Sequence, residues 1–200
     1  MSPTYLYCLT APAAPNPPPA TVGLDGGAVR RVGDAWVSDV DSLSVRATVD
    51  RIRAHDHVVA AALGTGSTPL PARFGQTFAS DAACVAAFSE KQVTMSAGLA
   101  RVAGMVEMTV ILRVALDTSS GTAYLTSLAR REHVAREFND ALSGYVRESA
   151  MHTREDVLTL SHLVEREALP KYIERAKALA TGVDARILGP GAPYSFGPPE

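Results

Sequence analysis

The sequence predicts an α+β protein with two small domains, the second of which has a ferredoxin-like βαββαβ fold. Three observations lead to this prediction. The hydrophobic period alternates between two and about 3.6 residues, a helix-ending glycine, Gly104, divides the chain near its middle, and the second half runs strand, helix, strand, strand, helix, strand. We therefore expect an N-terminal α+β domain over residues 1–103 and a C-terminal domain over residues 104–200, with the terminal segment GPGAPYSF in the second domain.

The first half begins with strand patterns. Residues 4–9 alternate and include aromatic side chains, as strands do, and the proline-rich run at 11–20 that follows lacks the amide donors of a sheet. Residues 29–32 and 35–40 flank a Gly-Asp pair, which tolerates the positive φ of a tight turn. We therefore expect a hairpin there.

Two helices and a short strand complete the first half. Residues 43–63 have a helical period that ends at Gly64, residues 70–74 form a short strand, and Ser80 caps a helix that ends at Gly104. The inward positions expected are Val45, Val49, Ile52, Val59 and Leu63 for the first helix, and Val85, Phe88, Met95, Leu99 and Val102 for the second.

The second half opens with residues 105–116, which are nearly all apolar and predict a central strand covered on both faces. A long helix at 122–147, a hairpin of 148–152 with 157–164, a helix from Pro170 to residue 180 and a strand at 185–188 follow. The inward positions expected for the two helices are Leu125, Leu128, Phe138 and Leu142, and then Ile173, Ala176 and Leu179.

The composition is that of a folded globular protein, with 46% hydrophobic and 20% charged residues. A net charge of −2, with acids near each basic pair, argues against nucleic acid as a partner. Cys8 and Cys84 form neither a metal motif nor a disulfide framework, so we expect buried, reduced thiols. Without a signal-like start or a long apolar run, we expect a cytoplasmic protein that does not enter a membrane.

The motifs that resemble chemical sites have the wrong spacing. His55 and His57 project about 200° apart on a helix, so they cannot share a metal ion and are expected on a solvated face. The run GTGST at 64–68 joins a helix to a strand and lacks a following Lys, which argues against a phosphate site. No Ser or Cys has a neighbouring His in a recognisable nucleophile motif. We therefore expect no catalytic residue, no metal site and no cofactor.

Four residues are expected to hold the junction between the domains. Glu107 interrupts an apolar strand and should pair with a cation such as Arg73 or lie at a sheet edge. Arg73 can stack on an aromatic ring and bind a carboxylate across the domain seam. With Phe74 beside it and Tyr194 in the terminal segment packing back, these residues receive structural roles at the seam.

Five motifs, in their order along the chain, resemble the gas-vesicle accessory family GvpL/GvpF. They are LPARFGQTF at residues 70–78, the helical HDHVVAAAL before it, and GMVEMTVILRV, GTAYL and GPGAPYSF after it. The resemblance extends from Tyr5 to Phe196.

The chain departs from the family pattern at four positions. Lys and Trp are common where Met105 and Met108 stand, and Trp and Pro are common where Gly191 and Ala192 stand. These differences, together with the proline-rich loop, leave the choice between the F and L branches open.

The resemblance implies a non-enzymatic gas-vesicle assembly protein with two α+β domains. Its implied partner is the GvpA-type shell protein, a small hydrophobic subunit, which it would bind as a minor vesicle component or to prevent aggregation before nucleation; other accessory proteins are further partners. We expect the contact surface on the first-domain sheet, at Tyr5, Tyr7, Arg30 and Trp36. Two alternatives are a cytosolic ferredoxin-like module that senses a small molecule and a hydrolase with a carboxylate site.

Overall fold

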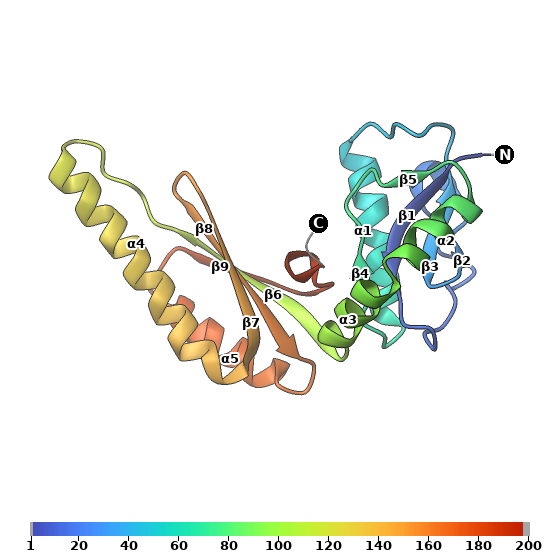
Figure 1. Ribbon diagram of the computed structural model, residues 1–200. Coiled ribbons are helices and arrows are strands. Elements are labelled where there is room, and N and C mark those ends of the chain that lie inside the picture. Colours follow the sequence, from blue (N-terminus) through green and yellow to red (C-terminus); the bar gives the residue numbers. More distant parts are fainter. Residues whose placement is uncertain (1, 198–200) are drawn as a thin grey trace. The chain divides into compact units, whose positions relative to one another are not determined.

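The computed structural model describes residues 2–197, which divide into two compact units (Figure 1). Among these residues, unit 1 contains 2–104 and 192–197, and unit 2 contains Met105–Gly191. Residues 192–196 of the terminal segment therefore belong to unit 1, whereas the whole segment was expected in the C-terminal domain; its first three residues, 189–191, do lie in unit 2. The physical reason is that Ala192 packs into the core of unit 1 and Phe196 is buried.

Unit 1 contains a five-stranded sheet in which β1 is central. β1 pairs antiparallel with β3 on one side and with β4 and β5 on the other, and β2 pairs with β3. The strands are β1 (Thr4–Leu9), β2 (Arg30–Val32), β3 (Ala35–Asp39), β4 (Leu70–Pro71) and β5 (Thr77–Phe78). The first strand and the hairpin are confirmed.

Helices cover both faces of the unit 1 sheet (Figure 1). α1 packs on one face, where Val58, Val59 and Ala62 join the core. α2 and α3 lie on the other face, where Phe88 and Met95 line a groove together with residues of β1. The helices are α1 (Val49–Gly64), α2 (Asp81–Glu90) and α3 (Gln92–Val102), with the short 3-10 turns η1 (Leu24–Gly26) and η3 (Tyr194–Phe196).

The inward face of α1 differs from the expected one. The helix begins at Val49 behind the N-cap Thr48, not at residue 43, and Val49 and Ile52 are 63% and 48% exposed. His55 is buried instead, with Val58, Val59 and Ala62. The prediction was wrong because it counted histidine as a solvated residue, whereas a histidine that gains a hydrogen bond can enter a core.

The strand and helix around Ser80 are also shorter than expected. β4 contains only Leu70 and Pro71, since proline cannot donate to a ladder. Ser80 does cap α2, accepting a hydrogen bond from the Ala83 amide at 3.2 Å. The single helix expected after it breaks at Lys91 into α2 and α3.

Unit 2 has the ferredoxin-like fold. Its elements are β6 (Met105–Arg113), α4 (Gly121–Leu142), η2 (Ser143–Tyr145), β7 (Val146–Arg154), β8 (Val157–Glu165), α5 (Leu169–Ala180) and β9 (Ala185–Gly191). The strands pair antiparallel in the order β7-β8-β6-β9, and both helices pack on one face of the sheet (Figure 1). The βαββαβ prediction is confirmed.

Only the second part of α4 packs against this sheet. Phe138 and Leu142 are buried as expected, together with Ala135. Leu125, in the first turns, is 65% exposed, so its inward assignment was wrong. A helical period identifies a face of a helix, but not how far along its length the sheet extends.

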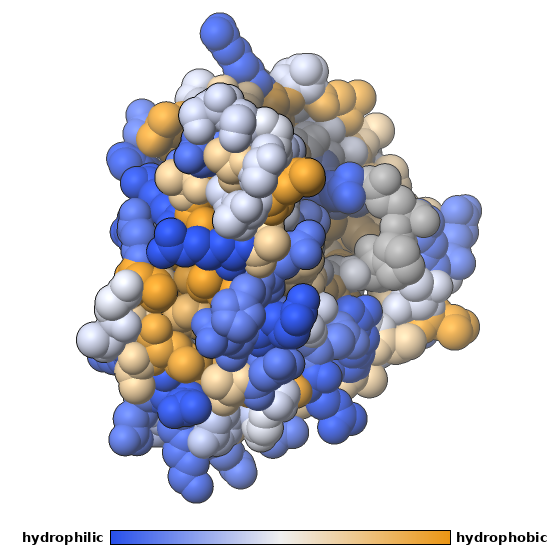
Figure 2. Space-filling model, turned by 90° about the vertical axis from the view of Figure 1, so that its left-hand side faces the viewer, coloured by the Kyte–Doolittle hydropathy of each residue, from blue (hydrophilic) through white to orange (hydrophobic). Residues whose placement is uncertain are grey.

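Unit 2 also exposes apolar side chains. Figure 2, which views the molecule from the left-hand side of Figure 1, shows apolar residues gathered in part of a face that is otherwise largely hydrophilic. The exposed large apolar residues of this unit are Tyr124, Leu125, Met151 and Val183.

Candidate functional site

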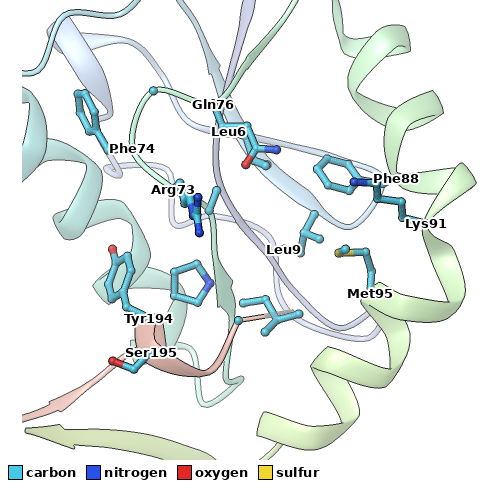
Figure 3. Close-up of a pocket in the computed structure, with 15 residues that line it drawn as sticks. Leu6, Leu9, Arg73, Phe74, Gln76, Phe88, Lys91, Met95, Tyr194 and Ser195 are labelled. Carbon is cyan, nitrogen blue, oxygen red and sulfur yellow. The ribbon is translucent and has the colours of Figure 1, made fainter. Parts of the chain in front are cut away.

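A groove of about 810 Å³ opens on unit 1 and is the candidate site (Figure 3). Its lining comes from β1, from the segment at 70–76, from α2 and α3, and from the terminal segment. The lining residues are Leu6, Leu9, Leu70, Pro71, Ala72, Arg73, Phe74, Gly75, Gln76, Phe88, Lys91, Met95, Tyr194, Ser195 and Gly197. Two of the motifs that carry the family resemblance, LPARFGQTF and GPGAPYSF, therefore meet at one groove.

The floor of the groove is apolar because of an irregularity in β1. The pairing of β1 with β3 shifts register between Leu6 and Cys8, as at a β-bulge. Tyr7 and Cys8 consequently both belong to the core beneath α1, while Leu6 and Leu9 line the groove. One face of β1 thus joins the core beneath α1, and the other lies at the base of the groove, where Leu6 and Leu9 are themselves buried.

Three hydrogen bonds hold the segment at 70–76 against β1. The Ala72 amide donates to the Tyr7 carbonyl at 2.8 Å, and the Leu6 amide donates to the Gln76 carbonyl at 3.0 Å. The Gly75 amide donates to the Tyr5 hydroxyl at 3.1 Å, from a backbone with φ of 88° that favours glycine. This wall of the groove is therefore held against the sheet by the protein itself.

Behind this wall lies a buried aromatic cluster. The Tyr5 hydroxyl lies 2.9 Å from Nδ1 of His55, and the ring of Phe74 packs against both, with centroids 6.0 and 5.9 Å away. Burial raises the pKa of Tyr5 to about 12 and lowers that of His55, an effect that the backbone of Ala72 partly offsets. Both groups are therefore neutral near pH 7.

The second nitrogen of His55 is unusual. Nε2 is buried and makes no hydrogen bond of normal geometry within residues 2–197, although the backbone of Ala72 is near enough to the imidazole to affect its pKa. His55 was expected on a solvated helix face, and its burial corrects that expectation.

Tyr194 borders the groove from the terminal segment. Its side chain is 46% exposed, and its hydroxyl lies 3.5 Å from a carboxylate oxygen of Asp56. Partial burial of the hydroxyl and the nearby Asp56 charge raise the pKa of Tyr194. Phe196, which is buried, holds this segment in unit 1.

The charged residues of the lining are both cationic. Arg73 and Lys91 are exposed and lie on different walls, Arg73 on the segment at 70–76 and Lys91 at the break between α2 and α3 (Figure 3). No Asp or Glu is among the described lining residues. A groove with an apolar floor and a cationic rim favours an apolar ligand that carries negative charge.

Of the four expected contact residues, only Arg30 lies partly at the surface. Tyr5, Tyr7 and Trp36 have no exposed area and pack in the core of unit 1, so in this conformation they offer no surface to a partner. Both faces of β1 are covered, which residue alternation alone did not indicate.

Arg30 belongs to an ion-pair network at the surface of unit 1. It donates to Asp39 at 2.8 Å and to Asp81, in the first turn of α2, at 2.7 Å. Burial would raise the pKa of Asp81, but hydrogen bonds from Thr4 and Arg30 and the charge of Arg30 lower it overall. The network therefore anchors the start of α2 to the sheet.

The expected seam residues fall into the two units. Arg73, Phe74 and Tyr194 line the groove of unit 1, whereas Glu107 lies in unit 2, buried on β6 opposite Leu163 of β8. Phe88, Lys91 and Met95 were not predicted from the sequence as members of a site. Their spacing is that of ordinary helix residues. They belong to the groove because the segments that carry the two motifs lie next to them in the structure.

Within residues 2–197, no group of three or more His, Cys, Asp or Glu side chains is arranged to hold a metal ion. In the same part of the chain, every helix is too short or too polar to cross a membrane. Cys8 and Cys84 are buried free thiols, as expected.

Comparison with protein families matches the chain to the model described as gas vesicle synthesis protein GvpL/GvpF, over residues 3–127 and 125–198. The chain belongs to this family. It is a family of gas vesicle accessory proteins and not a known enzyme family. No curated protein sequence gave a match.

Two solved structures share the fold of this GvpL/GvpF family member. The gas vesicle protein GvpF from Anabaena sp. PCC7120 is 20% identical, with a TM-score of 0.84 over 100% of this chain and 98% of that one. GvpF from Microcystis aeruginosa is 17% identical, with a TM-score of 0.81 over 98% of this chain and 99% of that one. The two-domain α+β architecture is therefore that of GvpF.

Proposed function

We propose that this protein is a non-enzymatic gas vesicle assembly factor that binds the hydrophobic GvpA-type shell subunit. It acts as a minor vesicle component or keeps the subunit from aggregating during nucleation, in the cytoplasm and at the vesicle, alone or with other accessory proteins. The observation that carries the proposal is the meeting of two family motifs at one open groove in unit 1. The role needs no catalytic group and no cofactor.

The groove suits such a partner physically. Phe88 and Met95 on the helical wall are only partly covered and offer apolar surface to a hydrophobic chain, above the buried floor residues Leu6 and Leu9. Burying apolar area contributes about 25 cal/mol per Å². Because the opposite wall is already held by hydrogen bonds to β1, less conformational entropy is lost on binding.

The test is co-purification of the shell subunit with this protein after co-expression in a host without other gas vesicle genes. We expect a soluble complex and less aggregated shell subunit than without the protein. A shell subunit that aggregates equally with and without this protein, and does not co-purify, would contradict the proposal.

A second candidate function, the sensing of a small molecule, is favoured by the groove volume. A volume of about 810 Å³ lies within the usual range of about 300–1,000 Å³ for ligand pockets. A metabolite screen by thermal shift tests it, since a ligand at 100 times its Kd adds about 2.7 kcal/mol of stability. The exposed rim argues for the protein partner, because small-molecule sites enclose most of their ligand.

A further inference from the structure

We propose that the unit 1 groove takes an extended, apolar peptide segment that carries an acidic side chain, whose carboxylate is recognised by Lys91 and Arg73. This inference rests on the proposed function in that the partner is a protein. Beyond the proposed function, it says where on unit 1 the partner segment binds and which side chains select it.

The apolar part of the specificity comes from side chains on the helical wall and the floor. Leu6 and Leu9 are buried residues of β1, and Phe88 and Met95 are half-buried on α2 and α3 (Figure 3). Because Phe88 and Met95 are only partly covered by the protein itself, a ligand side chain that enters the groove removes further apolar area from water.

The acidic part follows from the distribution of charge. The chain as a whole has a net charge of −2, yet the charged residues of the groove lining are Arg73 and Lys91, and none of its described lining residues is acidic. A cationic rim on a slightly acidic protein attracts a carboxylate and repels a cation, which gives specificity more than affinity.

The open form of the groove selects a chain rather than an enclosed molecule. Arg73, Gln76 and Lys91 are all exposed, so the groove is open to solvent along its rim. The lining extends from the break between α2 and α3, across β1, to Ser195 of the terminal segment (Figure 3). A segment that continues beyond both ends can lie in such a groove without being enclosed.

The experiment measures fluorescence anisotropy with three labelled nine-residue peptides and the full-length protein. Each peptide has Leu-Val on both sides of a central residue and Gly-Ser at both ends, and the central residue is Glu, Gln or Lys. An exposed ion pair changes affinity by about two- to fivefold. With two cations we expect the Glu peptide to bind about tenfold more tightly than the Lys peptide, with Gln between them and a smaller difference in high salt.

Charge-reversal variants test whether the groove causes this preference. Lys91→Glu brings the charge of the lining to zero and should reduce the tenfold preference to about one. Arg73→Glu/Lys91→Glu should reverse it. The matched control is Lys171→Glu, the same change at an exposed position on α5 in unit 2, which should keep the preference of the wild type.

Lys91→Glu should fold. Lys91 lies between the C-terminus of α2, where a negative charge is unfavourable, and the N-terminus of α3, where a negative charge is favourable, so the two effects oppose each other. If it does not fold, Met95→Gln replaces it and should weaken all three peptides about fivefold without changing their order. Three results would overturn the inference. The wild type could bind the three peptides equally, or the double variant could keep the preference of the wild type. Laurate could also displace the labelled peptide at a lower concentration than the unlabelled Glu peptide does.

The co-purification assay separates the two proposals. If the shell subunit co-purifies equally with the wild type and with Arg73→Glu/Lys91→Glu, the groove inference fails while the proposed function stands. If the shell subunit does not bind the wild type, the proposed function fails whatever the peptides show.

Discussion

Unit 1 and unit 2 each bury one histidine against a tyrosine, and they differ in how completely the imidazole is hydrogen-bonded. In unit 2, His162 lies 2.7 Å from the Tyr172 hydroxyl and 2.9 Å from the side-chain oxygen of Asn139, so both ring nitrogens are satisfied. In unit 1, His55 bonds Tyr5 through Nδ1, and Nε2 has no hydrogen bond in the described chain.

This difference accompanies a difference in surface. Unit 2 packs two helices on one sheet face around a core in which the histidine is fully bonded, whereas unit 1 has an open groove beside its histidine cluster. Complete packing and hydrogen bonding favour stability, and incomplete covering of apolar groups favours contact with a partner. We therefore expect the core of unit 2 to contribute more to stability than the groove of unit 1, where the proposed partner would bind.

The largest expected effect compares a core residue with a groove residue. Phe138→Ala in unit 2 should lower the free energy of unfolding by about 3–5 kcal/mol, because Phe138 is buried in the core. Met95→Ala at the groove should lower it by about 1 kcal/mol or less, because its side chain is already partly in water. Urea denaturation measures both, and equal losses would contradict this comparison of core and groove.

The next effect is a pH dependence carried by His162. Burial lowers the pKa of His162 to about 4, below its ordinary value of 6.5. Between these values the unfolded chain binds the proton and the folded chain does not, so stability is complete above pH 6.5 and is lost as the pH falls toward 4. The loss should amount to about 3 kcal/mol.

The measurement is urea denaturation at pH 7 and pH 4.5 for the wild type and His162→Gln, in which the titration is absent. The difference between their pH dependences isolates His162 from other groups, including His55, whose pKa is lowered in the same direction. Identical pH dependences would show that His162 is not the buried neutral group described here.

Two glycines with positive φ, one in each unit, compare the backbone strain of the two units. Gly189 of unit 2 has φ of 109°, and a Cβ there would lie 2.7 Å from the carbonyl oxygen of Glu107. Gly75 of unit 1 has φ of 88° but open space around it. Gly75→Ala should therefore cost about 1 kcal/mol for the left-handed backbone, and Gly189→Ala about 2 kcal/mol or more. Thermal unfolding compares them, with Gly144→Ala as a control at a position without either constraint.

An effect of similar size concerns the wall of the groove. Tyr5→Phe removes the hydroxyl that contacts His55 and accepts from the Gly75 amide, and should destabilise the protein by about 1–2 kcal/mol. The same variant should show faster hydrogen exchange at the Gly75 amide. The control is Tyr145→Phe in unit 2; if both substitutions have the same small effect, the Tyr5 hydroxyl does not hold the wall.

Much of the fold could be predicted because it depends on local properties. The aromatic side chains of β1, the cap at Ser80, the proline at the start of α5 and the order of elements in unit 2 all follow from residues that are close together in the sequence. The motifs that identify the GvpL/GvpF family are likewise short strings.

The site could be predicted only in part. Arg73, Phe74 and Tyr194 were singled out from their motifs, where they were expected at a seam between the domains. In the structure they line a groove of unit 1. Phe88, Lys91 and Met95 gave no signal, because helix residues near a groove have the same period as those over a core.

The sequence by itself determined the strand and helix periods, the ferredoxin-like order of unit 2 and the family. Only the tertiary structure decided that Tyr5, Tyr7 and Trp36 are core residues, that His55 is buried, and that a groove lies over the other face of β1. The physical reason is that burial depends on partners distant in sequence. Tyr5 contacts His55, which is 50 residues away in the chain, and no local sequence pattern indicates that contact.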